Sequence, residues 1–494
     1  MKIKDIIDRV DTISVVGEVD DTLNINSLSF DSRSVERGSC FFAIRGTRCD
    51  GHNFIAAVVR GGASVVVCEE MVECDHVEAD VCFVVVESSE RAMADVARLF
   101  YGDPSREIEL VGVTGTNGKS TTATLLADLF EELGYKTGLI STVTYRIAGN
   151  YFTSTHTTPD TIRLNAMLRQ MVDAGCSYCF MEVSSHSIVQ ERIAGFTFAG
   201  AIFTNLTHDH LDYHGTFMEY LKAKRSLFDR LPKGSFAVVN VDDRNGEVMV
   251  QNSRAKVVKY SSRRVADHTG RVVEMHFDGM LLSIDGRELW VKLIGGFNLH
   301  NLLAIYSTAL ELGMSSDEVL VAMSRLESVR GRFENFAAAG GRTIIIDYAH
   351  TPDALKVTLS TIGEMTKSTG CKIITVCGCG GDRDREKRPD MARIAYNGSS
   401  TAIFTSDNPR NENPESILED MVVGVLQIGR SAEHRWLKIT DRAEAIRTAV
   451  MLSEDGDVIL IAGKGHETYQ IIGESRHHFD DLEEAKQAVT QYLK

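Results

Sequence analysis

The sequence predicts an α/β protein of three domains, and three observations favour this fold class. At 494 residues the chain is too long for one ordinary hydrophobic core. Short apolar runs alternate with helical stretches through most of it, a pattern typical of mainly parallel sheets covered by helices on both faces. Polar or glycine residues follow many of these runs, at the strand ends where such sheets bind ligands.

The first domain is expected to be a small α/β unit over residues 1–105. A turn at Gly102-Asp103-Pro104-Ser105 precedes a new apolar run and gives the boundary. The strands are expected at 40–44, 64–68 and 81–86, followed by a helix at 89–100.

The second domain, residues 106–330, is expected to hold a mainly parallel sheet of the phosphate-loop (P-loop) type. Its strands are expected at 108–113, 179–183, 201–205 and 236–240, with a helix at 120–133. The third domain, residues 331–494, restarts the alternation and is expected to be a Rossmann-like, doubly wound sheet. Its strands are expected at 343–347, 372–376, 401–405 and 458–462, with loops at 347–350, 378–385, 407–410 and 463–467 gathered along one edge.

Composition and charge exclude several classes of protein. The 53 basic and 69 acidic residues give a net charge of −16, which disfavours non-specific binding to nucleic acid or to an anionic membrane. No apolar run has the length of a membrane span, and the first residues lack the pattern of a signal peptide, so a cytoplasmic location is expected. The ten cysteines are scattered, and the pair Cys176 and Cys179 has no second pair to complete a zinc site.

The segment from Val113 to Thr121 predicts a phosphate-binding loop and the use of ATP. A buried strand, a tight turn from Gly115 to Gly118 and a helix follow one another in the required order. Backbone amides and the helix N-terminus attract phosphate, Lys119 neutralises it, and the hydroxyl of Ser120 or Thr121 can bind magnesium. The glycine spacing departs from the usual GxxxxGK[ST] template. The residues predicted at this loop to bind ATP are Gly115, Thr116, Asn117, Gly118, Lys119, Ser120 and Thr121.

Two further strand ends carry polar side chains. Glu182 ends one apolar strand, and the stretch from Asn205 to His214, which has three histidines and two aspartates, follows the next. Magnesium prefers a few hard oxygen ligands together with phosphates and water. The sequence therefore predicts a magnesium site at this edge of the sheet.

Together these motifs resemble the Mur ligases, which add amino acids to a UDP-linked muramic acid. The resemblance rests on 115–121, on Met181-Glu182-Val183-Ser184-Ser185-His186 and on 205–214. Asp31-Ser32-Arg33 resembles the UDP-binding N-terminal domain of the member that adds the third residue. The match extends to the C-terminal domain through Gly296-Phe297-Asn298, Asn301, 347–353 and 463–467.

The resemblance implies roles that the residue pattern alone does not give. It implies catalytic roles for Lys119, Lys224, His210 and Glu182, with magnesium bound by Ser120, Thr121, Glu182, His210 and Lys224. Lys224 would react with CO2 to form a carbamate (N6-carboxylysine), although its position alone predicts an exposed helical lysine. Further ATP contacts are implied at Asn298, Asn301, Asp347 and His350, and contacts to UDP-MurNAc-L-Ala-D-Glu at Phe30, Ser32, Thr157, Thr158, Ser184, Gln190 and Arg192.

The segment Asp407-Asn408-Pro409-Arg410 resembles the motif of members that add meso-2,6-diaminopimelate. The distal end of this amino acid carries a carboxylate, which a guanidinium can bind through paired charge-assisted hydrogen bonds, whereas Arg410 would repel the ammonium of lysine. The implied diaminopimelate contacts are Arg383, Asp407, Asn408, Pro409, Arg410, Gly463 and Glu467.

The resemblance implies that ATP phosphorylates the D-glutamyl carboxylate and that the amine of diaminopimelate attacks the resulting acyl phosphate. ATP and Mg²⁺ are the expected cofactors. UDP-MurNAc-L-Ala-D-Glu and meso-diaminopimelate are the expected partners, and the enzyme is expected to be a monomer. Three alternatives remain: a lysine-adding ligase, a folylpolyglutamate synthase, which lacks the N-terminal domain, and a P-loop regulatory or motor ATPase. Arg410 and the N-terminal domain weigh against the first two, and the ATPase would leave 407–410 and Lys224 unexplained.

Overall fold

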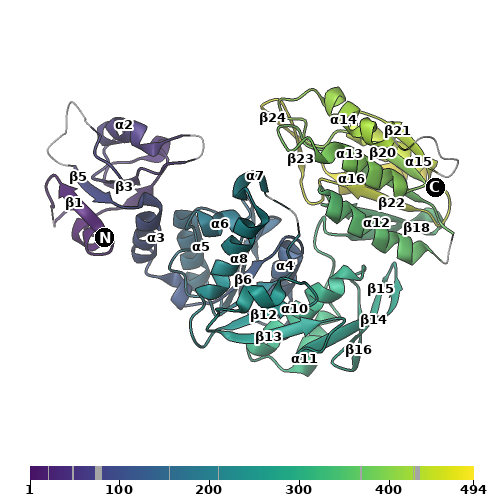
Figure 1. Cartoon of the computed structure of the whole chain (residues 1–494), viewed down its shortest axis with the longest axis horizontal. Coiled ribbons are helices and arrows are strands. Elements are labelled where there is room, and N and C mark those ends of the chain that lie inside the picture. Colours follow the sequence, from purple (N-terminus) through teal and green to yellow (C-terminus); the bar gives the residue numbers. More distant parts are fainter. Residues whose placement is uncertain are drawn as a thin grey trace. The chain divides into compact units, whose positions relative to one another are not determined.

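The chain forms two compact units, Met1–Lys259 and Tyr260–Lys494, which are described separately (Figure 1). The computed structural model describes residues 1–494 except 21, 47, 48, 73–80, 155, 208, 210, 368, 369, 427, 429–433 and 494, and it leaves the side chains of 211 and 212 undescribed. The domain boundaries expected at 105/106 and 330/331 stay a prediction. Among the helices of the described residues, none combines the length and apolar character needed to cross a membrane.

The amino-terminal region of the first unit has a sheet between helices. Its strands are β1 (Thr12–Val16), β2 (Ser27–Ser29), β3 (Ser39–Phe42), β4 (Val65–Cys68) and β5 (Cys82–Val86), and its helices are α1 (Ile3–Ile7), η1 (Ser32–Ser34), η2 (Gly51–Phe54), α2 (Ile55–Arg60), α3 (Ser89–Phe100) and η3 (Pro104–Arg106). The strand order is β1-β5-β4-β3-β2, and only the β1–β5 pair is antiparallel. Side chains alternate along β3: Phe42 joins the core under α1 and α3, while Phe41 joins the core under α2. The predicted strands and helix are confirmed, whereas β1, an apolar run whose side chains are mostly exposed, was not among the predicted strands.

The rest of the first unit is built around a mainly parallel sheet. Its strands are β6 (Glu109–Thr114), β7 (Thr137–Ile140), β8 (Thr144–Ile147), β9 (Asn150–Thr153), β10 (Tyr178–Glu182), β11 (Gly200–Phe203) and β12 (Phe236–Asn240), and its helices are α4 (Lys119–Glu132), α5 (Thr161–Asp173), α6 (Ser185–Val189), α7 (Leu211–His214), α8 (Phe217–Asp229) and α9 (Gly246–Val250). The order is β12-β11-β6-β10-β7-β8-β9. The β7–β8 and β8–β9 pairs are antiparallel. Because β6 lies between β10 and β11, the loops that follow these three strands meet at one edge.

The second unit begins with an antiparallel meander and two helices. β13 (Lys256–Ser261) spans the boundary between the units, and β14 (His268–His276), β15 (Gly279–Ile284), β16 (Arg287–Val291), α10 (Phe297–Glu311) and α11 (Ser316–Met323) follow. β14 pairs with β15 and β15 with β16, both antiparallel, and α10 contacts β14.

The remainder of the second unit is a doubly wound sheet, as predicted. Its strands are β17 (Glu334–Ala338), β18 (Arg342–Asp347), β19 (Ile373–Cys377), β20 (Thr401–Phe404), β21 (Arg435–Lys438) and β22 (Val458–Ala462), with a hairpin of β23 (Tyr469–Ile472) and β24 (Ser475–His478). Its helices are η4 (Ala339–Gly341), α12 (Pro352–Thr366), α13 (Lys387–Asn397), α14 (Pro414–Leu426), α15 (Arg442–Leu452) and α16 (Asp481–Tyr492). The sheet order is β17-β18-β22-β19-β20-β21, and only β17 is antiparallel.

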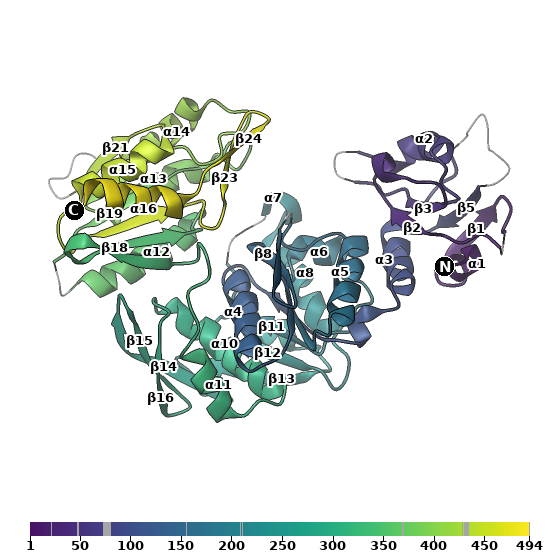
Figure 2. The same cartoon turned by 180° about the vertical axis from the view of Figure 1, so that it is seen from behind.

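Side chains from alternate positions of this sheet fill two cores. Ile345 packs with residues of α12, α13 and α14, while Ile344 and Ile346 pack with residues of α15 and α16. Figure 1 shows α12 and α13 on the near face of the sheet, and Figure 2, from behind, shows α16 on the other face. The loops after β18, β19, β20 and β22 therefore share one edge, as expected for a ligand site in this topology.

A buried ion pair joins α15 to α16 and supplies a stability prediction. Arg442 donates to both oxygens of Asp481 at 2.7 Å, and both side chains are fully buried. Replacing Asp481 with alanine leaves a buried guanidinium without its partner, which we expect to cost about 3–5 kcal/mol of unfolding free energy. Urea unfolding followed by circular dichroism measures this change. The exposed Arg447–Glu444 pair on α15 is the control, since Glu444→Ala should shift the midpoint little; equal shifts would contradict the prediction.

Candidate active site

The phosphate loop connects β6 to α4 and packs against the end of β11. Gly115 has a φ of +151°, and a Cβ at this position would lie 1.9 Å from Thr204 Oγ1, so the position requires glycine. The backbone N–H of Thr116 donates to the carbonyl of Asn205 at 2.8 Å, and that of Asn117 donates to Asn205 Oδ1 at 2.9 Å. The loop is thus fixed by the first residue of the predicted polar cluster.

Lys119, Ser120 and Thr121 occupy the first turn of α4. Lys119 Nζ lies over the loop and donates to the carbonyls of Gly115 at 3.0 Å and Thr116 at 2.7 Å. Ser120 and Thr121 are buried beside it. The cation, the helix N-terminus and the hydroxyls therefore lie together, as phosphate binding requires.

Lys224 reaches the same loop from α8. The pattern alone predicts an exposed lysine, and this is wrong: the side chain is 1% exposed, and its Nζ donates to the Gly115 carbonyl at 2.8 Å. Burial, and next the charge of Lys119, hold the pKa of Lys224 well below its ordinary value. A low pKa favours the neutral amine, which is the form that can attack CO2.

Glu182 ends β10 and is fully buried. Its Oε1 accepts from the backbone N–H of Thr142 at 2.6 Å, and its Oε2 accepts from Thr142 Oγ1 at 3.3 Å. Thr142 was not predicted from the sequence. It follows the apolar strand β7, the neighbour of β10, and a polar residue just after such a strand was the signal that could have indicated it.

The residues described here fit magnesium better than a metal that takes all its ligands from protein. Among the described residues, no group of three or more His, Cys, Asp and Glu side chains could hold an ion. One carboxylate, Glu182, and the hydroxyls of Ser120 and Thr121 suit an ion that completes its coordination with phosphates and water. Of the other two predicted ligands, Lys224 is described above and His210 lies outside the described residues.

Most predicted UDP-MurNAc-dipeptide contacts lie beside Glu182. Thr158 Oγ1 donates to the Glu182 carbonyl at 2.8 Å, and Arg192 Nη1 donates to the Thr158 carbonyl at 2.6 Å. Arg192 also donates to Gln190 Oε1 through Nε at 3.0 Å. Ser184 caps α6, and Thr157 accepts from Thr142 at 3.0 Å. Phe30, which is exposed, and Ser32 instead follow β2 in the amino-terminal region.

Three of the predicted diaminopimelate contacts, Asp407, Asn408 and Glu467, lie around a buried lysine. Lys464 Nζ donates to Asn408 Oδ1 and Glu467 Oε2, each at 3.2 Å, and lies 3.6 Å from Asp407 Oδ1. Asn408 Nδ2 donates to Glu467 Oε2 at 2.8 Å. Burial, and next the charge of Asp407, raise the pKa of Glu467. Sequence reasoning quoted Lys464 in a motif but gave it no role.

Arg410 and Arg383 come from two loops at the same edge. Arg410 has a φ of +51°, and its Nη1 donates to the carbonyls of Gly381 at 2.7 Å and Asn408 at 3.4 Å. Arg383 is exposed, and its Nη1 donates to the Asp382 carbonyl at 3.0 Å. Gly463 follows β22 with a φ of +119°, and a Cβ there would lie 3.4 Å from Asp407 Oδ2.

The four further ATP candidates also lie in the second unit. Asn298 Nδ2 donates to the Ile294 carbonyl and Asn301 Nδ2 donates to Asn298 Oδ1, each at 2.8 Å. Asp347 accepts from the backbone N–H of Phe333 at 2.8 Å, and burial raises its pKa. His350 is exposed, with Nδ1 2.8 Å from the Tyr348 carbonyl. The asparagines and Asp347 thus have local structural roles whatever else they bind.

Comparison with known protein families finds matches along most of the chain. Family models match the chain at three places: "Mur ligase family, catalytic domain" over residues 24–101, "Mur ligase middle domain" over 113–309 and "Mur ligase, glutamate ligase domain" over 331–465. The chain belongs to the Mur ligase family.

Several relatives match this chain over nearly all of its length and of their own. Proteins named UDP-N-acetylmuramoyl-L-alanyl-D-glutamate--2,6-diaminopimelate ligase are 52% identical over 481 residues in Cytophaga hutchinsonii (97% of each chain) and 51% identical over 487 residues in Bacteroides fragilis (99% of each chain). A solved structure of a ligase with that name is 31% identical, with a TM-score of 0.69 and coverage of 99% of each chain. A folylpolyglutamate synthase from Thermotoga maritima, 16% identical, has a TM-score of 0.57 over 76% of this chain and 90% of its own, which shows a shared fold alone.

Proposed function

We propose that this Mur ligase adds meso-2,6-diaminopimelate to the D-glutamyl carboxylate of UDP-MurNAc-L-Ala-D-Glu, using ATP, in peptidoglycan precursor synthesis. The observation that carries the proposal is the contact between the loops after β20 and β22, where the Asn408 carbonyl accepts from Arg410 and Asn408 Nδ2 donates to Glu467. A guanidinium and a carboxylate carried by neighbouring loops offer one partner for the distal carboxylate of diaminopimelate and one for its distal ammonium. The names of the relatives agree with this substrate.

The chemistry assigned to the first unit is carboxylate activation. The γ-phosphate of ATP passes to the D-glutamyl carboxylate, giving an acyl phosphate and ADP, and the diaminopimelate amine then displaces phosphate to form the amide. Lys119 offsets charge on the transferring phosphoryl group, and the loop amides and the α4 N-terminus position it. Arg192, Thr158 and Ser184 are assigned to hold the dipeptide arm beside Glu182.

Magnesium is assigned to Ser120, Thr121, Glu182, His210 and Lys224 in its carbamate form, and it would screen the phosphate charge. The proposal further includes three functional domains, 1–105, 106–330 and 331–494, a monomeric enzyme and a cytoplasmic location.

Because magnesium is assigned to this site, chelation with EDTA is expected to abolish ATP-dependent phosphate release, and added Mg²⁺ should restore it. Full activity in the presence of the chelator would remove the metal from the proposal.

Phosphate release measured with UDP-MurNAc-L-Ala-D-Glu and ATP tests the proposed reaction. The assay is run with meso-diaminopimelate, with L-lysine and with no amino acid. Release stimulated by diaminopimelate is expected, with the amide product detected by mass spectrometry. Stimulation by lysine alone would indicate the lysine-adding alternative, and release independent of any amino acid would indicate a regulatory ATPase.

A further inference from the structure

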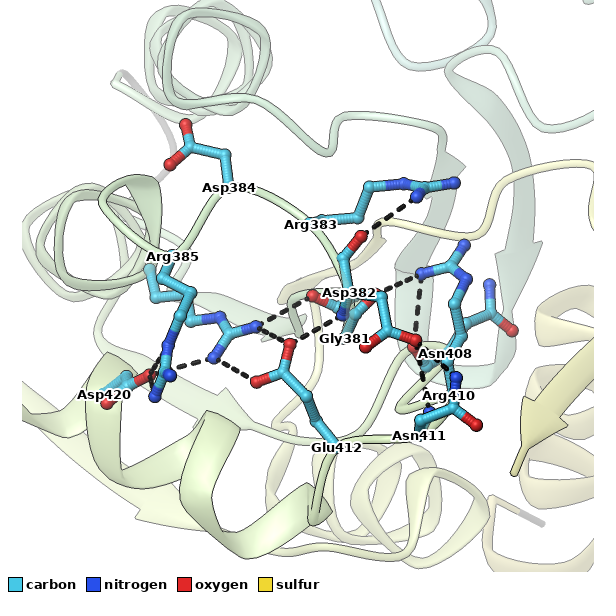
Figure 3. Close-up of polar contacts among 12 residues, drawn as sticks. Gly381, Asp382, Arg383, Asp384, Arg385, Asn408, Arg410, Asn411, Glu412 and Asp420 are labelled. Atoms are coloured by element: carbon cyan, nitrogen blue, oxygen red, sulfur yellow. Dashed lines mark hydrogen bonds and ion pairs between the residues drawn. The ribbon is translucent and has the colours of Figure 1, made fainter. Parts of the chain in front are cut away.

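Figure 3 shows the two loops of the second unit that carry Arg383 and Arg410. A buried arginine that takes no part in the reaction proposed above joins these loops. Arg388 lies in the first turn of α13 and its side chain is fully buried. Its Nη1 donates to Glu412 Oε2 and to Asp420 Oδ2, each at 2.9 Å. Its Nη2 donates to Glu412 Oε1 at 2.8 Å and to the Gly380 carbonyl at 3.3 Å. The guanidinium therefore binds the first loop, which follows β19, directly at Gly380. It binds the second loop, which follows β20, through a bidentate pair with Glu412.

Glu412 also binds the first loop, at the peptide group between Gly381 and Asp382. Its Oε1 accepts from the backbone N–H of Asp382 at 2.6 Å. That N–H belongs to the same peptide unit as the carbonyl of Gly381, which accepts from Arg410 Nη1 at 2.7 Å. Since a peptide unit is planar and rigid, its hydrogen bond to Glu412 also sets the direction of the carbonyl that orients Arg410.

The two loops are in close contact along this path. The backbone N–H of Gly381 donates to the Asn408 carbonyl at 2.9 Å, and Asn411 Nδ2 donates to Asp382 Oδ2 at 2.8 Å. A Cβ on Gly381 would lie 1.9 Å from the Pro409 carbonyl oxygen, and one on Gly380 would lie 2.8 Å from Arg410 Nη1. Any movement of the first loop is therefore transmitted to the second.

Backbone strain shows that the arrangement needs external support. Asp382 and Arg410 both have left-handed backbone conformations, with φ of +52° and +51°. Non-glycine residues are strained in this region and persist where surrounding contacts fix them. The hydrogen bond of Arg388 lowers the pKa of Glu412, so this carboxylate keeps its charge for the pair.

We propose that Arg388 is a positioning residue for amino-acid recognition: through Gly380 and Glu412 it fixes the peptide that orients the Arg410 guanidinium. This inference rests on the proposed function, because it takes Arg410 as the residue that binds the distal carboxylate of diaminopimelate. It predicts that loss of Arg388 weakens the use of diaminopimelate selectively, with little effect on the sites in the first unit.

The test compares the kinetic constants of the full-length enzyme and its Arg388→Met variant. We expect the KM for meso-diaminopimelate to rise about tenfold or more, while the KM values for ATP and UDP-MurNAc-L-Ala-D-Glu stay within about twofold. The preference for diaminopimelate over L-lysine should fall in parallel. Arg388→Lys, which keeps the charge without the fork, should fall between the wild type and Arg388→Met.

A matched control separates positioning from a general loss of stability. Arg342 starts β18, at the opposite edge of the same sheet, and donates to Ala339, Ser453 and Asp455. Arg342→Met should lower the midpoint of thermal unfolding and leave the KM for diaminopimelate unchanged. If the KM stays at its wild-type value in Arg388→Met, or if all three KM values rise together, the inference is overturned.

A second variant keeps the inference testable if Arg388→Met does not fold. Glu412→Gln preserves the size of the side chain while removing the charge that pairs with Arg388, and its side chain is 22% exposed. A selective rise in the KM for diaminopimelate supports positioning, and a wild-type KM overturns it. If diaminopimelate does not stimulate the wild-type enzyme, both the proposed function and this inference fail; if it does and the variants match the wild type, only the inference fails.

Discussion

Lys224→Arg is expected to lower the kcat of ligation by about 10²–10³-fold, because arginine keeps a positive charge but cannot become the carbamate. The structure supplies the reason for expecting a reactive lysine here. The amine is buried, lies 2.8 Å from the Gly115 carbonyl and has a pKa well below the ordinary lysine value because of burial and Lys119. The neutral amine attacks CO2 through its lone pair and then loses a proton, giving an anion beside the phosphate loop.

Phosphate release under saturating substrates measures this effect, and ¹³C NMR of enzyme equilibrated with labelled bicarbonate detects the carbamate carbon directly. Lys222 on the same helix is the matched control, because it is exposed and pairs with Glu219. Lys222→Arg should retain wild-type activity and the carbamate signal. A Lys224→Arg enzyme within about twofold of wild type would show that no carbamate is needed.

The candidate sites were predictable where polar or glycine residues with a chemical role come at or just after the end of an apolar strand. The phosphate loop, Glu182 and the loop after β20 each come directly after an apolar strand, so topology alone brings the first two together at one edge. The doubly wound sheet was predictable for the same reason, since β18, β19, β20 and β22 are largely apolar runs, whereas β17 and β21 are more polar and were not predicted. Local spacing does not reveal which residues lie beneath those loops.

Burial and long-range partners account for what the sequence missed. Lys224 has the helical context of an exposed lysine and is buried only because α8 packs against the phosphate loop. Arg388 stands in a run of charged residues, and its role depends on Glu412 and Asp420, which lie 24 and 32 positions away. The β8–β9 hairpin turns at Ala148 and Gly149, both with positive φ, and alanine gives little warning of such a turn.

Arg410→Met is expected to reduce kcat/KM for meso-diaminopimelate by about 10²–10⁴-fold, since two hydrogen bonds to a charged group contribute roughly 1.5–3 kcal/mol each. L-lysine lacks the distal carboxylate, so its kcat/KM should change little or rise as the repelling guanidinium is removed. The backbone of residue 410 is held independently, because its N–H donates to the Ile471 carbonyl at 3.1 Å and its carbonyl accepts from Gly473 at 2.8 Å. The effect should therefore come from the side chain.

Arg410→Lys tests whether charge alone suffices at this position. Lysine presents a point charge in place of a planar fork, so we expect this variant to recover only part of the lost kcat/KM for diaminopimelate. Arg447→Met, which removes an exposed arginine from α15, is the control and should leave both amino acids unaffected. Competition between diaminopimelate and lysine in one reaction, with products separated by mass, gives the specificity ratio directly. If that ratio is unchanged in Arg410→Met, recognition of the distal carboxylate must come from other groups, and Arg383 is then the next residue to replace.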